Sequence, residues 1–233
     1  MVLHSHLPYQ MRGENIMKVV ALIPLKLNNE RCPGKNTRAF NNGKPLVTYI
    51  LETLKKVKKV DEIYVYCSNE KIKDYLSNNI KFLKRDPKFD SQSASMNEIL
   101  LEFSKEVPAD IYVLAHATAP FLSTNSIQDG LSKVLSRKYD SAFTVIKLNE
   151  FIWKDNKPLN YNLDNIPRTQ DLYPLYVETT GLYIYTHELI TKENRRIGYN
   201  PYLIPISKME ACDINDEDDF IVADAIFNSL YKE

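Results

Sequence analysis

The chain has 233 residues, which is the size of a single domain. Its 30 lysine and arginine residues equal its 30 aspartate and glutamate residues in number, which argues against a nucleic-acid-binding protein. No apolar run approaches the roughly 20 residues of a membrane span, and the three cysteines lie far apart without a metal-binding spacing. We therefore expect a cytoplasmic protein that has neither nucleic acid nor a membrane as a partner.

The first 16 residues differ from the rest of the chain. They have a mixed polar and apolar pattern, without the long apolar stretch or the small-residue cleavage site of a signal peptide. The pattern of a buried strand begins directly after Met17. We therefore expect residues 1–16 to be a disordered extension and residues 17–233 to form the domain.

Strand and helix patterns alternate as far as residue 146. Short runs of β-branched, aromatic and other apolar residues predict strands at 18–24, 62–67, 80–83, 110–115 and 141–146. Apolar residues at helical spacing predict helices at 46–57, 70–77, 95–107 and 125–136. This alternation predicts an α/β fold with three layers, α/β/α, around a mainly parallel, doubly wound sheet.

The pattern changes after residue 147. Residues 149–175 are aromatic and polar and contain prolines, but they show no clear helical period. We interpret them as an excursion from the sheet, with a hairpin that contacts a partner subunit. A strand at 181–185 and a closing amphipathic helix at 218–231 complete the domain.

The candidate functional segments follow the predicted strands. In open α/β sheets, ligands bind at the carboxyl ends of the strands, so we expect these segments to meet at one edge. They are the loop 26–35, the segment 85–95, the segment 116–120, Lys154 and the segment 213–216.

The loop after the first strand contains three cations within ten residues, Lys26, Arg31 and Lys35. A triphosphate carries several negative charges, which cationic side chains neutralise as the leaving group departs. Gly34 permits a close approach of the backbone to a ligand. The loop is therefore a candidate phosphate site, and the alternative interpretation is a solvated basic loop.

The segment before the last helix is acidic. On an extended backbone, the side chains of Asp213 and Asn215 point the same way, and both offer the hard oxygen ligands that Mg²⁺ prefers. The helix dipole also favours acidic residues in the first turn of a helix. We therefore assign Asp213 and Asn215 to a metal site and residues 217–219 to the start of the helix.

Two further segments place polar groups at strand ends. Arg85 is followed by Ser93, Ala94 and Ser95, whose hydroxyl and amide groups suit a base or a ribose, although helix capping accounts for one of the serines. His116 is the only histidine that we expect at the end of a central strand. A structural role for this histidine is the alternative to a binding role.

Taken in order, these segments resemble those of the acylneuraminate cytidylyltransferase family, which includes CMP-sialic acid and CMP-Kdo synthetases. The resemblance runs from about Met17 to the end of the chain. It is carried by Pro33-Gly34-Lys35-Asn36, Gly43-Lys44-Pro45-Leu46, Ser93-Ala94-Ser95 after Arg85, His116-Ala117-Thr118-Ala119-Pro120, Pro167-Arg168-Thr169-Gln170, Thr180-Gly181-Leu182-Tyr183-Ile184 and Asp213-Ile214-Asn215-Asp216-Glu217-Asp218-Asp219-Phe220.

The resemblance implies a Rossmann-like nucleotide-diphospho-sugar transferase fold and a homodimer that the excursion at 149–175 helps to form. It implies a Mg²⁺-dependent enzyme that transfers CMP from CTP to a nonulosonic acid or a related 3-deoxy-2-keto sugar acid. The anomeric hydroxyl of this anionic acceptor would attack the α-phosphate of CTP and release pyrophosphate. The product would serve cell-surface glycan synthesis, in a lipopolysaccharide or a capsule.

The resemblance also implies roles for individual residues. Catalysis would depend on Lys26 and Lys35. The nucleotide would contact Leu25, Lys26, Arg31, Lys35, Asn36, Arg85, Ser93, Ala94 and Ser95. The acceptor would contact His116, Thr118, Lys154, Arg168 and Gln170, and Mg²⁺ would bind Asp213 and Asn215.

The sequence departs from the family pattern at Lys26, Glu30, His116 and Asn215, where the family has arginine, lysine, glutamine and aspartate. Two alternatives therefore stay open. One is a nucleotide-binding protein without catalysis, because Glu30 and Asn215 both weaken the expected charge arrangement. The other is a cytidylyltransferase whose acceptor is a phosphate or a phosphonate.

Overall fold

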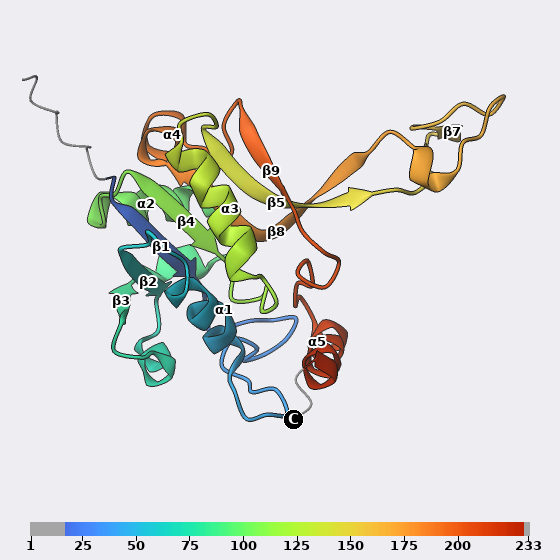
Figure 1. The fold of residues 1–233 in the computed structure, drawn as a ribbon. Coiled ribbons are helices and arrows are strands. Elements are labelled where there is room, and N and C mark those ends of the chain that lie inside the picture. Colours follow the sequence, from blue (N-terminus) through green and yellow to red (C-terminus); the bar gives the residue numbers. More distant parts are fainter. Residues whose placement is uncertain (1–16, 231–233) are drawn as a thin grey trace, which may run out of the picture.

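A seven-stranded sheet with the order β3-β2-β1-β4-β8-β5-β9 forms the centre of the structure, a computed structural model that describes residues 17–230 (Figure 1). Its strands are β1 (Val19–Pro24), β2 (Glu62–Cys67), β3 (Ile80–Lys84), β4 (Ile111–Ala115), β5 (Ser141–Leu148), β8 (Leu175–Thr186) and β9 (Pro201–Pro205). Only β8 runs antiparallel to its neighbours in this sheet of the described residues. The prediction of a mainly parallel sheet is confirmed, whereas the expectation for residues 1–16 lies outside the described residues.

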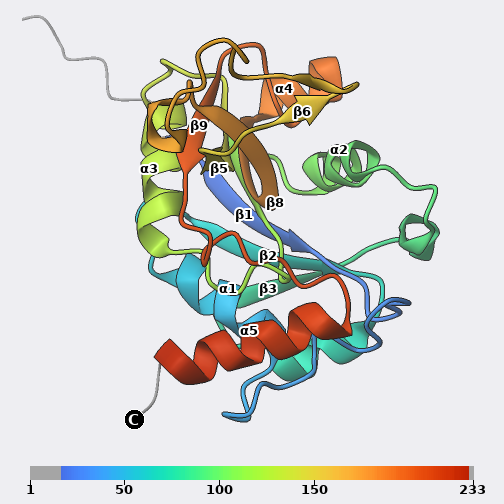
Figure 2. The ribbon, with the colours of Figure 1, turned by 90° about the vertical axis from the view of Figure 1, so that its right-hand side faces the viewer.

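Helices cover both faces of the sheet (Figure 2). On one face lie α1 (Leu46–Lys55) and α3 (Thr124–Leu135), and on the other lie α2 (Met96–Glu106) and α4 (His187–Glu193). The remaining elements are η1 (Glu70–Tyr75), η2 (Pro87–Asp90), β6 (Trp153–Lys154), β7 (Lys157–Pro158), η3 (Thr169–Asp171) and α5 (Glu217–Leu230). The predicted three-layer α/β/α fold is confirmed. Within residues 17–230, no helix is long and apolar enough to cross a membrane.

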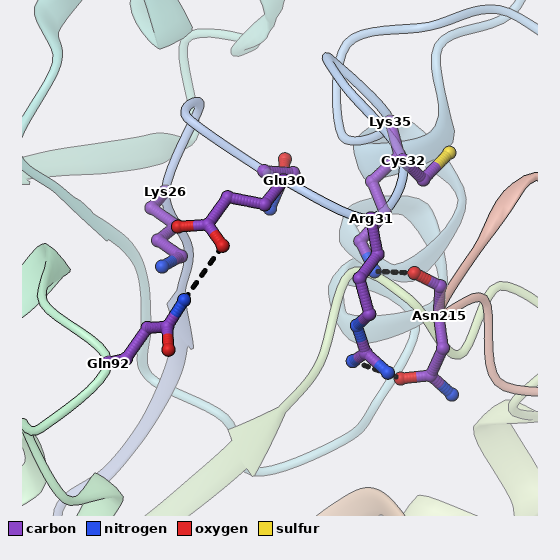
Figure 3. A pocket seen from close by; sticks show the side chains of 8 residues that line it. Lys26, Glu30, Arg31, Cys32, Lys35, Gln92 and Asn215 are labelled. Carbon is purple, nitrogen blue, oxygen red and sulfur yellow. Dashed lines mark hydrogen bonds between the residues drawn. The ribbon is translucent and has the colours of Figure 1, made fainter.

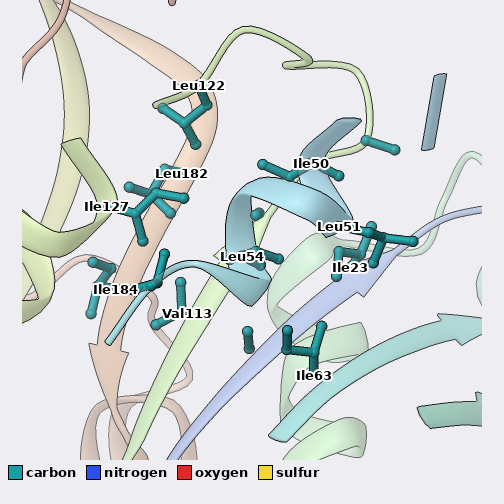
Figure 4. Close-up of a cluster of buried hydrophobic side chains, with 14 of the residues drawn as sticks. Ile23, Ile50, Leu51, Leu54, Ile63, Val113, Leu122, Ile127, Leu182 and Ile184 are labelled. Atoms are coloured by element: carbon teal, nitrogen blue, oxygen red, sulfur yellow. The ribbon is translucent and has the colours of Figure 1, made fainter. Parts of the chain in front are cut away.

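Alternate residues of the central strands face the two helical layers. On β1, Ile23 faces α1 and α3 and belongs to the same buried cluster as Leu54 (Figure 4). The preceding residue of the strand, Leu22, faces α2 and α4 on the opposite face. In that cluster the ring of Phe103 makes an edge contact with the ring of Tyr66. Because β1 is buried on both faces, it reads as an almost continuous apolar run in the sequence.

Polar side chains cap the starts of several helices. The hydroxyl of Ser95 accepts a hydrogen bond from the backbone of Glu98, whose carboxylate accepts one from the backbone of Ser95, so α2 begins with a capping box. Asn69 likewise caps the helix predicted at 70–77, which is the 3-10 helix η1. We did not predict β9 or α4, because β9 has a proline at each end and α4 has only seven residues.

Strands β5 and β8 continue beyond the sheet as a two-stranded arm that carries β6 and β7 (Figure 1). Large apolar side chains are exposed along it, namely Phe151, Trp153, Leu159, Leu163, Ile166, Tyr173, Tyr176 and Val177. The segment 149–175 thus leaves the seven-stranded sheet. Its contact with a partner subunit stays a prediction.

Helix α5 packs against the loop that follows β1 and against the first turn of α1. Its Phe220 contacts the ring of Phe40, which follows the loop after β1, with the ring centroids 5.1 Å apart. Just before the helix, the backbone N–H of Ile214 donates a hydrogen bond of 2.9 Å to the carbonyl oxygen of Thr118. These contacts bring the acidic segment 213–216 to the ends of β1 and β4.

Candidate functional site

A cavity of about 440 Å³ lies at the carboxyl edge of the sheet (Figure 3). It is lined by Lys26, Asn29, Glu30, Arg31, Cys32, Lys35, Gln92 and Asn215. Three of the segments that we expected at this edge therefore meet around one cavity: the loop after β1, the turn before α2 and the segment before α5.

The loop after β1 depends on the backbone conformation of Gly34. This residue has a φ of +68°, in the left-handed region that favours glycine. Its carbonyl oxygen accepts hydrogen bonds of 3.0 Å from the backbone N–H groups of Thr37 and Arg38. A Cβ atom added to Gly34 would meet no atom within 4 Å. The glycine is needed for its backbone angle, and a close approach of its backbone to a ligand stays a prediction.

Lys35 places a buried cation between the loop and the acidic segment. Its side chain is only 8% exposed. Its Nζ donates a hydrogen bond of 2.5 Å to the carbonyl oxygen of Ile214 and a longer one of 3.4 Å to that of Asn215. Burial lowers the pKa of Lys35, and the nearby carboxylate of Asp213 acts in the opposite direction. The segment before α5 thus holds this ammonium group in a fixed position.

Asn36 and Leu25 support the loop from inside. The Nδ2 of Asn36 donates hydrogen bonds to the carbonyl oxygen of Lys26 (2.9 Å) and to Oδ1 of Asn29 (3.4 Å). Leu25 is buried, and its backbone N–H donates to the carbonyl oxygen of Tyr66. Neither Asn36 nor Leu25 lines the cavity. Asn36 instead holds in place Lys26 and Asn29, which do line the cavity.

Two hydrogen bonds join the loop to the turn before α2. The Nζ of Lys26 donates to the carbonyl oxygen of Asp90 (2.9 Å), and Nε2 of Gln92 donates to the carboxylate of Glu30 (2.7 Å), as Figure 3 shows for the second pair. Glu30 therefore places a negative charge in the cavity, where it opposes the binding of phosphate. This is the position at which the sequence departs from the family pattern by a full reversal of charge.

Arg85 lies beneath the turn and does not line the cavity. It is 3% exposed and forms an ion pair with Asp90, with 2.6 Å between Nη2 and Oδ1. The other oxygen of Asp90 accepts a hydrogen bond of 2.5 Å from the hydroxyl of Ser68. Arg85 thus fixes the turn that begins at Asp90. Above it, Ser93 is exposed within 3.0 Å of the Ser91 hydroxyl, Ala94 is half-buried and Ser95 caps α2.

Asp213 has one carboxylate oxygen without a partner. Its Oδ2 accepts hydrogen bonds from the hydroxyl of Thr180 (3.2 Å) and from Nδ2 of Asn215 (2.9 Å). Its Oδ1 is buried and has no hydrogen-bond partner among the described residues. Mg²⁺ is commonly bound by one or two carboxylates together with substrate phosphates, so a free oxygen of Asp213, near Lys35 of the candidate phosphate loop, fits this ion.

The remaining protein groups do not form a metal centre of their own. Within the described part of the chain, no group of three or more His, Cys, Asp or Glu residues could hold a metal ion. Asn215 turns its amide nitrogen toward Asp213, and its oxygen accepts a hydrogen bond of 3.1 Å from Arg31. In this arrangement the oxygen of Asn215 faces Arg31 and not Asp213, and the role of Asn215 as a metal ligand stays a prediction. An ion at Asp213 would need the oxygens of a bound substrate.

His116 and Thr118 lie beside the acidic segment. The backbone of His116 donates a hydrogen bond of 3.0 Å to the carbonyl oxygen of Gly181 on β8. A Cβ atom added to Gly181 would lie 2.9 Å from that of Ala119, so this loop and β8 are in close contact. Burial lowers the pKa of His116 to about 4, against a smaller opposite effect of Asp213. The imidazole is therefore neutral at pH 7.

The predicted acceptor residues are not all brought together. Lys154, Arg168 and Gln170 lie on the arm, which extends away from the cavity of the same chain (Figure 1). Arg168 is exposed and forms an ion pair of 2.7 Å with Asp171. These three residues therefore do not line one pocket with His116 and Thr118 of the same chain, because the β5–β8 ribbon carries them outward.

Four residues in or near the site were not among the predicted ones: Asp90, Gln92, Thr180 and Arg196. Gln92 lies next to the predicted Ser93, and Thr180 stands in a segment that carries the family resemblance, so a local signal existed for both. Arg196 had no such signal. Its Nη1 donates to Oδ1 of Asn97 (3.0 Å), its guanidinium lies over the ring of Tyr183, and its charge helps to lower the pKa of His116.

Comparison with known sequences gives consistent relatives. A family model described as cytidylyltransferase matches residues 20–216. The chain is 26% identical over 185 residues to the N-acylneuraminate cytidylyltransferase of Oncorhynchus mykiss, which covers 75% of this chain and 42% of that protein. It is 26% identical over 195 residues to the 8-amino-3,8-dideoxy-manno-octulosonate cytidylyltransferase of Shewanella frigidimarina (strain NCIMB 400), covering 75% and 77% of the two chains. The chain thus matches less than half the length of the first of these relatives.

Two solved structures share the fold. One is a CMP:2-keto-3-deoxy-manno-octonic acid synthetase complexed with CTP, with a TM-score of 0.68 and 14% identity over 91% of this chain and 99% of that chain. The other is the 4-diphosphocytidyl-2C-methyl-D-erythritol synthase of Anaerococcus prevotii DSM 20548, with a TM-score of 0.67 and 16% identity over 92% and 97%. At these identities the similarity shows the fold alone.

Proposed function

We propose, from the premise that this chain belongs to the cytidylyltransferase family, that it transfers CMP from CTP to a 3-deoxy-2-keto sugar acid and releases pyrophosphate. The single observation that carries the proposal is the position of Lys35. This buried cation is held between the loop after β1, which is the candidate phosphate site, and the segment that contains Asp213. The two relatives at 26% identity are named for acidic sugars, which supports an acceptor of the nonulosonic or octulosonic acid class. We place the product in cell-surface glycan synthesis.

The charges of the loop suit the departure of pyrophosphate. As the bond between the α-phosphorus and the bridging oxygen breaks, negative charge develops on the leaving group, and fixed cations stabilise it. Lys35 and Arg31 line the cavity, and Lys26 lines its other side. We assign the triphosphate to these three residues, with Lys35 as the most rigidly held. Arg85 contributes indirectly, because its ion pair with Asp90 fixes the turn that carries Ser93, Ala94 and Ser95.

We propose that Asp213 holds Mg²⁺ through its free Oδ1, together with oxygens of the triphosphate. The ion would supply charge neutralisation and orientation at the α-phosphate. Thr180 and Asn215 hydrogen-bond to the other oxygen of Asp213, so the carboxylate is oriented before any ligand binds.

We place the acceptor beside His116 and Thr118, because its hydroxyl must reach an α-phosphate next to Asp213. The neutral imidazole of His116 can hydrogen-bond to a sugar hydroxyl without adding charge. We further propose a homodimer in which the arm of the second copy supplies Lys154, Arg168 and Gln170. The exposed apolar residues of the arm support this arrangement, and the planar guanidinium of an arginine suits a carboxylate.

The test is an incubation of the purified protein with CTP, Mg²⁺ and a panel of 3-deoxy-2-keto sugar acids, with one phosphonate and one phosphate acceptor added to the panel. Pyrophosphate release with at least one sugar acid is the expected result, and mass spectrometry would identify the CMP ester. Binding of CTP without turnover on any acceptor would contradict the transferase proposal. It would support the nucleotide-binding alternative, which the carboxylate of Glu30 in the cavity favours.

A further inference from the structure

The side-chain amide of Asn215 has both of its ends engaged. Its Oδ1 accepts a hydrogen bond of 3.1 Å from Nη2 of Arg31, and its Nδ2 donates one of 2.9 Å to Oδ2 of Asp213 (the Arg31 bond is drawn in Figure 3). A guanidinium only donates and a carboxylate only accepts. This orientation of the amide is therefore the one that satisfies both neighbours, and it joins a cation to an anion through a neutral group.

The backbone of Asn215 is also fixed. Its N–H donates a hydrogen bond of 2.8 Å to the carboxylate of Asp219 in the first turn of α5, and its carbonyl oxygen accepts from Lys35. The backbone of Asn215 is thus held at its N–H and at its carbonyl oxygen. This fixed backbone keeps the side chain of Asn215 in place between Arg31 and Asp213.

Among the three side chains that these hydrogen bonds connect, Arg31 is the one whose positive charge can bind an anionic ligand. It lines the cavity and is exposed. Arg38, Arg85 and Arg168 each pair with a carboxylate, whereas the described residues offer Arg31 no carboxylate within ion-pair distance. Its charge therefore remains available to an anion in the cavity.

We propose that Asn215 is a positioning residue that holds Arg31 beside Asp213, so that the guanidinium binds the phosphates of the nucleotide without help from a metal ion. This inference rests on the proposed function, because the anion is the triphosphate of CTP. An aspartate at position 215 would also accept from Arg31, but it could not donate to Asp213 and would repel it. Asparagine is the residue type that connects the two groups without this repulsion.

The test measures CTP binding by calorimetry in the presence of EDTA, so that only protein groups contribute. Arg31→Ala removes charge-assisted hydrogen bonds to phosphate and should weaken metal-free binding about tenfold or more. Asn215→Ala should cause most of the same loss. The double variant should bind no more than about twofold more weakly than Arg31→Ala, because residues that act as one unit are not additive. Lys192→Ala, which removes an exposed cation on α4, is the control and should bind CTP like the wild type.

Three outcomes overturn the inference. The first is an unchanged metal-free affinity in Asn215→Ala combined with a higher Mg²⁺ requirement for CTP binding, which would make Asn215 a metal ligand. The second is an additive loss in the double variant. The third is a wild-type protein that does not bind CTP either with or without Mg²⁺. This third outcome would also overturn the proposed function, whereas the first two would leave that function intact. Thermal unfolding checks that each variant is folded, and Asn215→Ser replaces Asn215→Ala if the latter is not.

Discussion

The ammonium group of Lys35 donates a hydrogen bond of 2.5 Å to the backbone carbonyl oxygen of Ile214, which lies 179 residues away in the sequence. The side chain of Lys35 is 8% exposed, so this bond is shielded from water. It joins the loop after β1 to the segment that carries Asp213. Lys35 therefore both lines the cavity and joins two of the segments that surround it.

Replacement of Lys35 by alanine should reduce kcat/KM for CTP by about 100-fold or more, the loss typical of a fixed group that stabilises developing charge. It should also lower the free energy of unfolding by about 1–3 kcal/mol, because the carbonyl oxygen of Ile214 loses its donor. Pyrophosphate release and urea unfolding measure the two effects. Lys105→Ala, which removes an exposed cation of α2, serves as the control. Turnover of Lys35→Ala within twofold of the wild type would refute the assigned role.

Replacement of Asp213 by asparagine should abolish the stabilisation by Mg²⁺ in the presence of CTP and reduce turnover about 100-fold. The reason is that the free Oδ1 belongs to the carboxylate that we assign to the ion. Thermal unfolding with CTP, with and without Mg²⁺, measures the first effect. Asp218→Asn is the matched control, because Asp218 lies in the first turn of α5 and should contribute less than about 1 kcal/mol to stability through the helix dipole. Equal effects of the two substitutions would argue against a metal role for Asp213.

Replacement of Arg85 by alanine should lower the free energy of unfolding by about 3 kcal/mol, because it leaves Asp90 without its buried partner. The double variant with Asp90→Ala should recover part of this loss. Arg168→Ala is the control, since its ion pair with Asp171 is exposed and should contribute less than about 1 kcal/mol. Urea unfolding measures all three variants. A loss of CTP affinity in Arg85→Ala without a loss of stability would instead indicate direct contact with the nucleotide.

The stability of the protein should decrease between pH 6.5 and pH 4 in a way that depends on His116. The unfolded chain has the ordinary histidine pKa of 6.5, whereas burial lowers the pKa of His116 to about 4 in the fold. Between these values the unfolded state binds a proton that the folded state does not, so acidification favours unfolding, by up to about 3 kcal/mol. Urea unfolding at several pH values should show a shallower decrease for His116→Gln. An identical pH profile for this variant and the wild type would show that His116 does not cause the effect.

Introduction of a charge on the arm should dissociate the proposed homodimer. Ile166 is 60% exposed on the arm, and a carboxylate there would be buried without a partner in a dimer. Ile166→Asp should therefore sediment as a monomer and lose turnover at low acceptor concentration. Ile221→Asp, at a 57% exposed position on α5, is the matched control and should remain a dimer. A wild-type protein that sediments as a monomer at every concentration would contradict the dimer.

The sequence by itself determined the layers of the fold and the starts of several helices. Strands such as β1 are buried on both faces, so burial alone makes them continuous apolar runs. Capping is also local: Ser95 binds Glu98 three residues away, and the acidic run at 217–219 forms the first turn of α5 as predicted. The basic loop and the acidic segment were likewise visible as charge patterns.

Only the tertiary structure decided which of these groups meet. The antiparallel place of β8 between β4 and β5 and the hydrogen bond between Lys35 and Ile214 depend on pairings far apart in sequence, which leave no periodic signal in the chain. The same holds for the amide oxygen of Asn215, whose partner Arg31 lies 184 residues away in the sequence. A local pattern reports how deeply a residue is buried, but the partner of a polar group is set by the segments that packing brings beside it.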